Sequence, residues 1–203
     1  MPEITQITIQ TKNKKRCNLF VDGQFFAGIS VETVVKNRLE VGAFVEAKDL
    51  QSMIEQSERA EALSKAADYV SKSLKTKKQV KDYLLRKGYS EEIAWYCVDK
   101  LKEYNYIDDK EYSKRYIESV SKDNGKRLVE YKLMMKGVRK EDVESAYQDV
   151  EIDSKENAKN IADKYLKNKD KSKETLAKAY RYLIGKGFNY EEATYALSFY
   201  KED

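Results

Sequence analysis

The chain has 203 residues, a formal net charge of +4, 41% hydrophobic residues and 36% charged residues. This length suits one or two domains, and a charged fraction well above the roughly 25% of average proteins predicts small or elongated modules with a large solvated surface. The modest positive charge does not by itself indicate a nucleic-acid partner, and no apolar run is long enough to span a bilayer.

Catalytic and metal-binding functions are disfavoured by what the chain lacks. It has no histidine, the commonest general base and metal ligand, and no phosphate-binding loop or dinucleotide fingerprint. Cys17 and Cys97 are too far apart for a CxxC motif, and the densest acids, Asp108, Asp109 and Glu111, suit a helix start better than a metal site. The N-terminal residues lack a signal-like apolar core. We therefore expect a non-catalytic, monomeric, cytoplasmic protein without cofactor, metal or membrane partner.

The first part of the chain has the pattern of β-strands. β-branched residues dominate positions 4–9, and the segments Asn18-Leu19-Phe20-Val21 and Gln24-Phe25-Phe26 flank the pair Asp22-Gly23. An Asp-Gly pair between apolar runs is a strong hairpin signal, because glycine adopts positive φ without steric penalty. The basic run from Lys12 to Arg16 is expected to form the loop between the first two strands.

Two short helical patterns, near residues 31–38 and 47–57, complete a predicted β-hairpin module that spans residues 1–58.

From residue 59 onward the pattern is helical, and it repeats. Lys-Gly pairs recur at Gly88, Gly137 and Gly187, with spacings of 49 and 50 residues, and the same apolar columns accompany each glycine. Such columns on both sides of a glycine predict two amphipathic helices separated by a turn. The columns are Val80, Val129 and Ala179 eight residues before the glycine, Leu84, Leu133 and Leu183 four before, Leu85, Met134 and Ile184 three before, Ala94, Val143 and Ala193 six after, Cys97, Ala146 and Ala196 nine after, Val98, Tyr147 and Leu197 ten after, and Leu101, Val150 and Tyr200 thirteen after.

With a further helix at the start of each unit, these columns predict three tandem three-helix repeats at residues 59–108, 109–153 and 154–203. The predicted fold class is therefore mainly α, an elongated array of repeats preceded by a small N-terminal β-hairpin module. The alternative is a single compact helical bundle. Each glycine is expected to end its helix with positive φ, and Ser90 and Asn189 are expected to cap the helices that follow.

Positive charge recurs in phase with the repeat. Residues 72–87, 122–140 and 164–186 are basic and surround the second helix of each unit, whereas residues 141–156 are acidic. Because equivalent positions line up in stacked repeats, we predict a basic stripe that suits a phosphate backbone or an acidic protein groove. The alternative is that these residues form ordinary solvated helix faces with mixed ion pairs.

Several segments resemble the RecX family. Residues 101–112 (LKEYNYIDDKEY) resemble its central motif, in which a helix ends in an Ile-Asp-Asp turn and an aromatic-rich helix follows. The pair Arg115-Tyr116, then Gly125, then residues 133–138 (LMMKGV) continue the pattern in order. The segment from Leu84 to Leu101 and the Phe20-Val21-Asp22-Gly23 hairpin resemble the longer RecX proteins of Gram-positive bacteria.

The resemblance implies tandem three-helix repeats that bind in the groove of the RecA–DNA filament, inhibit ATP hydrolysis and strand exchange, and affect filament assembly in recombination and DNA repair. It implies no catalytic residues. The expected partner is the RecA filament, with single- and double-stranded DNA as further candidates. The competing hypothesis is an architectural DNA-binding protein, in which each Lys-Gly turn joins two helices in a helix-turn-helix manner. The residues predicted to contact RecA or DNA are Arg86, Lys87, Arg115, Arg127, Lys132, Lys136, Arg181 and Lys186.

Overall fold

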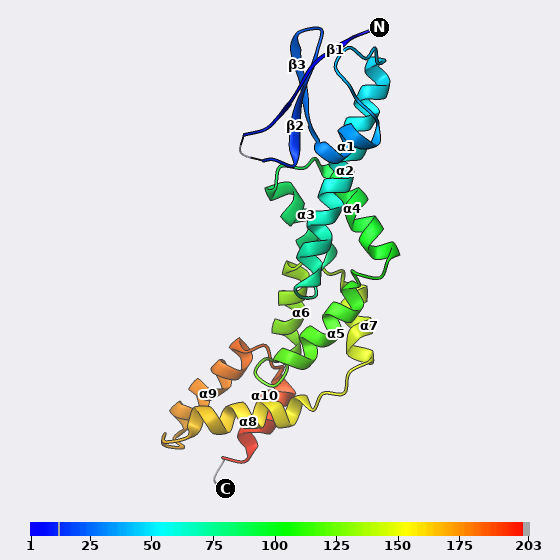
Figure 1. Ribbon diagram of the computed structural model, residues 1–203. Coiled ribbons are helices and arrows are strands. Elements are labelled where there is room, and N and C mark those ends of the chain that lie inside the picture. The colour runs from blue at the N-terminus through cyan, green and yellow to red at the C-terminus, as the bar shows by residue number, and fades with distance from the viewer. Residues whose placement is uncertain (12, 201–203) are drawn as a thin grey trace. The chain divides into compact units, whose positions relative to one another are not determined.

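The computed structural model describes residues 1–11 and 13–200, which form a three-stranded sheet followed by helices (Figure 1). The chain divides into two compact units: unit 1 contains residues 1–72 and 81–104, and unit 2 contains residues 73–80 and those from 105 onward. The elements are β1 (Ile4–Ile9), β2 (Arg16–Val21), β3 (Gln24–Ser30), α1 (Val31–Lys36), α2 (Ala47–Ser71), α3 (Lys77–Arg86), α4 (Glu91–Glu103), α5 (Asp109–Val120), α6 (Lys126–Met135), α7 (Lys140–Gln148), α8 (Ser154–Leu166), α9 (Lys173–Gly185) and α10 (Tyr190–Ser198).

The sheet is antiparallel, with the strand order β1-β2-β3. Asp22 and Gly23 connect β2 to β3 with φ angles of 48° and 80°. Two successive positive φ angles define the tight turn that matches the twist of a hairpin, so the hairpin prediction is confirmed. Arg16, which the sequence placed in the preceding loop, begins β2, and Lys12 of that predicted loop lies outside the described residues.

One long helix covers the sheet where two helices were predicted. The short helix expected at residues 47–57 and the helix expected from residue 59 are both parts of α2, which has 25 residues. No glycine or proline interrupts this stretch, so the helix has no reason to end there. The predicted module boundary after residue 58 therefore lies inside a helix. In Figure 1 the first half of α2 runs beside the sheet, where Leu50 and Ile54 join the apolar core of Ile4, Leu19, Val21, Ile29 and Leu39.

A polar network within unit 1 joins the sheet to the helices. Arg16 of β2 forms an ion pair with Glu61 of α2. Lys65 Nζ lies 2.7 Å from Glu61 Oε1 and donates to the hydroxyl of Tyr89 at 2.8 Å. Burial by itself raises the pKa of Glu61, but the hydrogen bond from Lys65 and the charge of Arg16 outweigh it and hold that pKa below its usual value. The carboxylate therefore stays ionised and links two cations.

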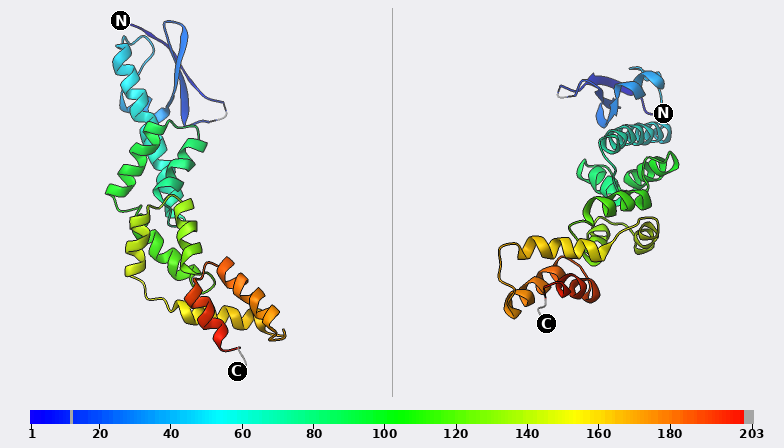
Figure 2. Two further views of the ribbon diagram at one scale, coloured as in Figure 1. Left: turned by 180° about the vertical axis from the view of Figure 1, so that it is seen from behind. Right: turned by 90° about the horizontal axis from the view of Figure 1, so that it is seen from below.

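Each repeat contains three helices, namely α2–α4, α5–α7 and α8–α10, and the first helix of each packs against the third (Figure 2). The columns four and eight residues before each glycine are fully buried, as predicted. The column three residues before the glycine behaves differently, because Leu85 is 39% exposed and Met134 is 53% exposed. That column is apolar in every repeat, yet it faces outward in the first two.

The predicted helix caps are present. The Ser90 hydroxyl accepts a hydrogen bond from the backbone N–H of Ile93. Asn189 and Glu192 form a reciprocal capping box at the start of α10. These side chains satisfy backbone donors that have no partner within the helix, which fixes where α4 and α10 begin.

Asp149, which follows α7, accepts hydrogen bonds from Lys110 and Lys114 of α5 and lies 2.8 Å from each ammonium. These two bonds lower its pKa to about 2. A depressed carboxyl pKa contributes stability above the unfolded value of 3.8, and this contribution is lost as the pH falls toward 2.

Asp149→Asn should therefore lower the urea midpoint of unfolding at neutral pH, and the difference from wild type should shrink toward zero near pH 2. The matched control is Asp99→Asn, which replaces an exposed carboxylate in unit 1. An equal deficit of the Asp149 variant at both pH values would contradict this account.

Candidate interaction surface around the Lys-Gly turns

All three Lys-Gly turns have the same backbone geometry. Gly88, Gly137 and Gly187 have φ angles of 89°, 83° and 90°, which confirms the prediction of positive φ. In the first turn, the N–H of Tyr89 donates to the carbonyl of Leu84 at 3.2 Å and that of Gly88 donates to Leu85 at 2.9 Å; the other two turns repeat both bonds. This is the glycine-ended helix terminus in which left-handed backbone satisfies the last carbonyl groups.

Two of the turns also form joints with the start of another helix in unit 2. The carbonyl of Lys136 accepts a hydrogen bond from the Thr76 hydroxyl at 2.7 Å, just before α3 begins. The carbonyl of Lys186 accepts from the N–H of Gly125 at 2.9 Å, just before α6 begins. A Cβ added at Gly137 would overlap the side chain of Lys78, and one added at Gly187 would overlap Leu128. Around Gly88, by contrast, the described residues leave a Cβ free space.

The predicted contact residues differ in exposure. Arg86, Lys87, Arg115, Arg127 and Arg181 are exposed, whereas Lys132, Lys136 and Lys186 are half-buried. Three of them have polar partners: Arg86 Nε donates to the carbonyl of Asp82 at 3.2 Å, Arg115 pairs with Glu111 at 2.8 Å, and Lys132 donates to the side chain of Asn124 at 3.1 Å. Arg127 and Arg181 are exposed and have no side-chain hydrogen bond or ion pair among the described residues, and Arg86 and Lys87 are exposed as well.

The lysine that precedes each glycine lies over a tyrosine ring. The ammonium groups of Lys87, Lys136 and Lys186 are 5.6, 5.5 and 5.6 Å from the ring centroids of Tyr83, Tyr116 and Tyr182. Two of these rings stack on a tyrosine of the preceding helix, Tyr83 on Tyr69 at 4.2 Å and Tyr182 on Tyr165 at 4.7 Å. The sequence analysis identified the lysines but not the rings. The tyrosines hold each ammonium by a cation–π contact and leave part of its surface exposed.

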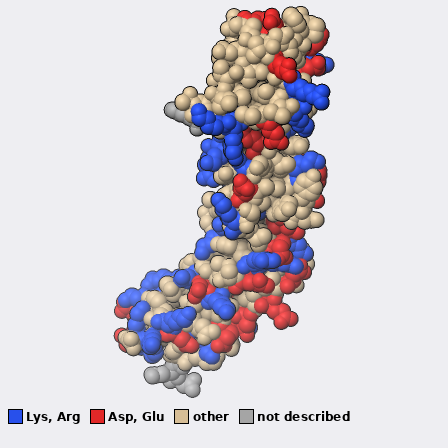
Figure 3. Space-filling view, in the orientation of Figure 1, with Lys and Arg blue, Asp and Glu red and all other residues tan. Residues whose placement is uncertain are grey.

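Figure 3 shows where charge gathers on one face of each unit. In unit 1, basic side chains lie over the loop between β1 and β2 and the end of α3, and in unit 2 they lie over α8 and α9. Acidic side chains are interspersed in both units, and many lysines take part in ion pairs, for example Lys126 with Glu130 and Lys178 with Glu174. Arg127 and Arg181, on the helices that precede two of the Lys-Gly turns, are exposed and take part in none of the ion pairs found among the described residues.

Asp108 and Asp109 occupy helix starts. Asp108 caps its own helix, α5, by accepting hydrogen bonds from the N–H groups of Lys110 and Glu111. Asp109 is buried and accepts instead from the N–H of Lys77 at 3.0 Å, where α3 begins. Burial raises the pKa of Asp109, and the hydrogen bond and positive charge of Lys77 oppose that rise. Neither carboxylate belongs to a metal-binding group of three or more ligands among the residues described.

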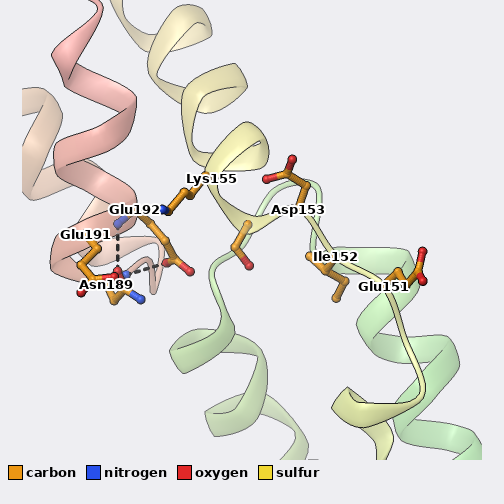
Figure 4. Close-up of a pocket in the computed structure, with 8 residues that line it drawn as sticks. Glu151, Ile152, Asp153, Lys155, Asn189, Glu191 and Glu192 are labelled. Atoms are coloured by element: carbon orange, nitrogen blue, oxygen red, sulfur yellow. Dashed lines mark hydrogen bonds between the residues drawn. The ribbon is translucent and has the colours of Figure 1, made fainter.

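An open pocket of about 790 Å³ lies beside the start of α8 and the start of α10 (Figure 4). It is lined by Glu151, Ile152, Asp153, Ser154, Lys155, Asn189, Glu191 and Glu192. Glu192 and Asn189 hold one another in the capping box drawn with dashed lines, and Asp153 caps α8 through the N–H of Glu156. Asp153 and Glu192 serve helix starts, and the negative charge of the acidic side chains around the pocket disfavours a phosphate ligand.

The helical repeats and their recurrent lysine–tyrosine turns define a helical-repeat protein with an N-terminal sheet. Proteins of this class commonly use their repeated surfaces to bind extended partners. No helix in the described part of the chain has the length and apolar content to cross a membrane. The family models for the N-terminal domain of regulatory protein RecX and for the first three-helix domain of RecX match residues 2–46 and 62–101.

The chain is 35% identical over 144 residues to regulatory protein RecX of Clostridium botulinum (strain Alaska E43 / Type E3). The aligned residues cover 71% of this chain and 68% of that protein. It is 33% identical over 150 residues to the protein of that name from Clostridium botulinum (strain Eklund 17B / Type B), with 74% and 71% covered. A crystal structure of regulatory protein RecX matches 95% of this chain and 97% of its own, with a TM-score of 0.69 and 23% identity, which shows the shared fold. The chain belongs to the RecX family of regulatory proteins.

Proposed function

We propose that this protein regulates RecA by binding the RecA–DNA filament and inhibiting its ATP hydrolysis and strand exchange. Family membership supports a regulatory role. The observation that carries the proposal is the recurrence of an exposed cation on or beside the second helix of each repeat, with Arg86 on α3, Arg127 on α6 and Arg181 on α9. A filament built of identical subunits presents its acidic and phosphate groups repeatedly, and a protein with repeated cations can meet several of them.

The test uses Arg86→Glu, Arg127→Glu and Arg181→Glu in one protein. Each surface pair contributes roughly 0–1 kcal/mol, so the three reversals together should raise the concentration needed for half-inhibition of the RecA ATPase on single-stranded DNA by about tenfold or more. Reversing Lys87, Lys136 and Lys186 would be a less selective change, because Lys136 and Lys186 are half-buried over tyrosine rings.

The matched control replaces three exposed lysines outside the predicted contact residues, Lys36, Lys48 and Lys102, with glutamate. It changes the net charge by the same amount as the arginine variant. Unaltered inhibition by the arginine variant, with an intact circular dichroism spectrum, would contradict the role of these cations. No inhibition by the wild-type protein would contradict the proposed function itself.

An architectural DNA-binding role predicts a different result. Binding through Z phosphates lowers the logarithm of the affinity by roughly 0.7–0.9 Z per decade of salt, even with bare DNA. Tight, strongly salt-dependent binding to bare DNA that the addition of RecA leaves unchanged would favour that role over filament regulation.

A further inference from the structure

Helix α6 of the second repeat is apolar on the side that faces solvent. Tyr131, Met134 and Met135 are 60%, 53% and 61% exposed. On a helix, Met134 and Met135 project within about 60° of Tyr131, so the three side chains share one face. Val129 and Leu133, on the opposite side of the helix, are fully buried in the core of the repeat. A helix with apolar residues on both sides is normally covered on both.

The equivalent helices of the other two repeats do not have this property. At the position of Tyr131, six residues before the glycine, they carry Asp82 and Arg181, and at the position of Met135 they carry Arg86 and Gly185. The three helices occupy the same place in their repeats and need the same outward solubility. Tyr131 and Met135 are therefore a local addition of the second repeat, next to Met134, whose position is apolar in all three repeats.

One charged side chain lies within this apolar face. Arg127 is exposed, lies one turn before Tyr131, and its guanidinium takes part in none of the ion pairs found among the described residues. Its backbone N–H donates to the carbonyl of Gly187 at 3.2 Å, which fixes the position of the residue and leaves the side chain available. We define Arg127, Tyr131, Met134 and Met135 as the α6 outer face.

The composition of the α6 outer face indicates a protein as its occupant. Methionine has no donor for a phosphate, and its flexible thioether adapts well to apolar pockets. Tyrosine and arginine are the residues most enriched among those that dominate binding energy at protein interfaces. The exposed guanidinium of Arg127 can form a bidentate pair with a carboxylate of such a partner.

The size of the face argues against a second copy of this chain. Three side chains of this size, each a little more than half exposed, present roughly 350 Å², far below the roughly 800 Å² per partner of a stable interface. A patch of that size acts as the apolar centre of a larger contact, whose remainder is supplied by the polar surface around it.

We propose that the α6 outer face docks on a protein partner that has an apolar pocket for Tyr131 and Met135 and a carboxylate at the pocket rim for Arg127. This proposal rests on the proposed function, because the pocket is assigned to the protein component of the RecA filament and not to its DNA. It places the central apolar contact on the second repeat, with the exposed arginines of α3 and α9 contributing charge.

The test compares Tyr131→Gln with Met135→Gln in one chain against a control, Val35→Gln with Val41→Gln, in which two valines of 70% and 62% exposure are replaced in unit 1. Binding of each fluorescently labelled protein to RecA filaments on single-stranded DNA is measured by anisotropy. The α6 variant should bind roughly 30-fold more weakly, as expected for the loss of an interface centre, and the control should bind like wild type. The loss should persist at raised salt, because apolar contacts are not screened. Each single substitution, expected to weaken binding several-fold, serves if the double variant is less stable.

Equal filament binding by the α6 variant and wild type would overturn the docking proposal and leave the proposed function intact. A parallel loss of binding to bare single-stranded DNA would also overturn it, because the face would then contact nucleic acid. So would a wild-type dimer that the substitutions convert to a monomer in sedimentation. Failure of the wild-type protein to bind filaments would remove the proposed function and this inference together.

Discussion

Replacing Gly187 with alanine should lower the free energy of unfolding by about 3 kcal/mol, as the sum of two separate effects. A Cβ in left-handed backbone costs roughly 1–2 kcal/mol, and Gly187 has a φ of 90°. The added methyl would also overlap Leu128 and the chain at Gly125, and such overpacking costs roughly 1–3 kcal/mol. Gly137→Ala should show the same two effects, with a smaller second part because the flexible side chain of Lys78 can move.

Two further glycines separate these effects. Gly88 has a φ of 89° and free space around it among the described residues, so Gly88→Ala should cost only the backbone part, roughly 1 kcal/mol. Gly125 has a φ of −73° but lies against the backbone of Gly187 and Phe188, so Gly125→Ala should cost only the packing part. Urea unfolding of the four variants measures both parts. Equal losses at Gly88 and Gly187 would show that the joint between the turn and the next helix contributes nothing.

Replacing Asp109 with alanine should lower the free energy of unfolding by about 3 kcal/mol, about as much as Gly187→Ala. The side chain is 4% exposed, accepts a hydrogen bond from the N–H of Lys77, and lies 3.8 Å from the ammonium of the same residue. Its loss leaves the first donor of α3 without its partner, and truncating one member of a buried polar pair typically costs about 2–4 kcal/mol.

The neighbouring aspartate provides the control. Asp108 is exposed and caps only its own helix, so Asp108→Ala should cost about 1 kcal/mol. Asp109→Asn keeps one oxygen acceptor, so its loss of unfolding free energy should lie between those of the two alanine variants. The free energy of unfolding from urea titrations checks this order. A larger loss for Asp108→Ala than for Asp109→Ala would show that the start of α3 is held by other groups.

The sequence by itself determined the local structure of this protein. The apolar runs around the Asp22-Gly23 pair predicted the hairpin, and the columns spaced from Gly88, Gly137 and Gly187 predicted the helices and the residues buried four and eight positions before each glycine. It also predicted the positive φ of those glycines. These features depend on residues close together in the chain, whose backbone preferences and helical periodicity act locally. The continuity of α2 was missed because a change of hydrophobic pattern was interpreted as a helix end, although no helix-breaking residue is present.

Only the tertiary structure decided what each shared position does. It directed the carboxylate of Asp109 to the first N–H of α3 rather than to its own helix, and it made Gly137 and Gly187 joints while leaving Gly88 in free space. It put the apolar residues Met134 and Leu85 on the outside, although their column recurs like a core position. The physical reason is that periodicity assigns side chains to a face of a helix, whereas burial depends on which other helix covers that face. That information lies in contacts between residues distant in sequence, and a repeat pattern by itself does not contain it.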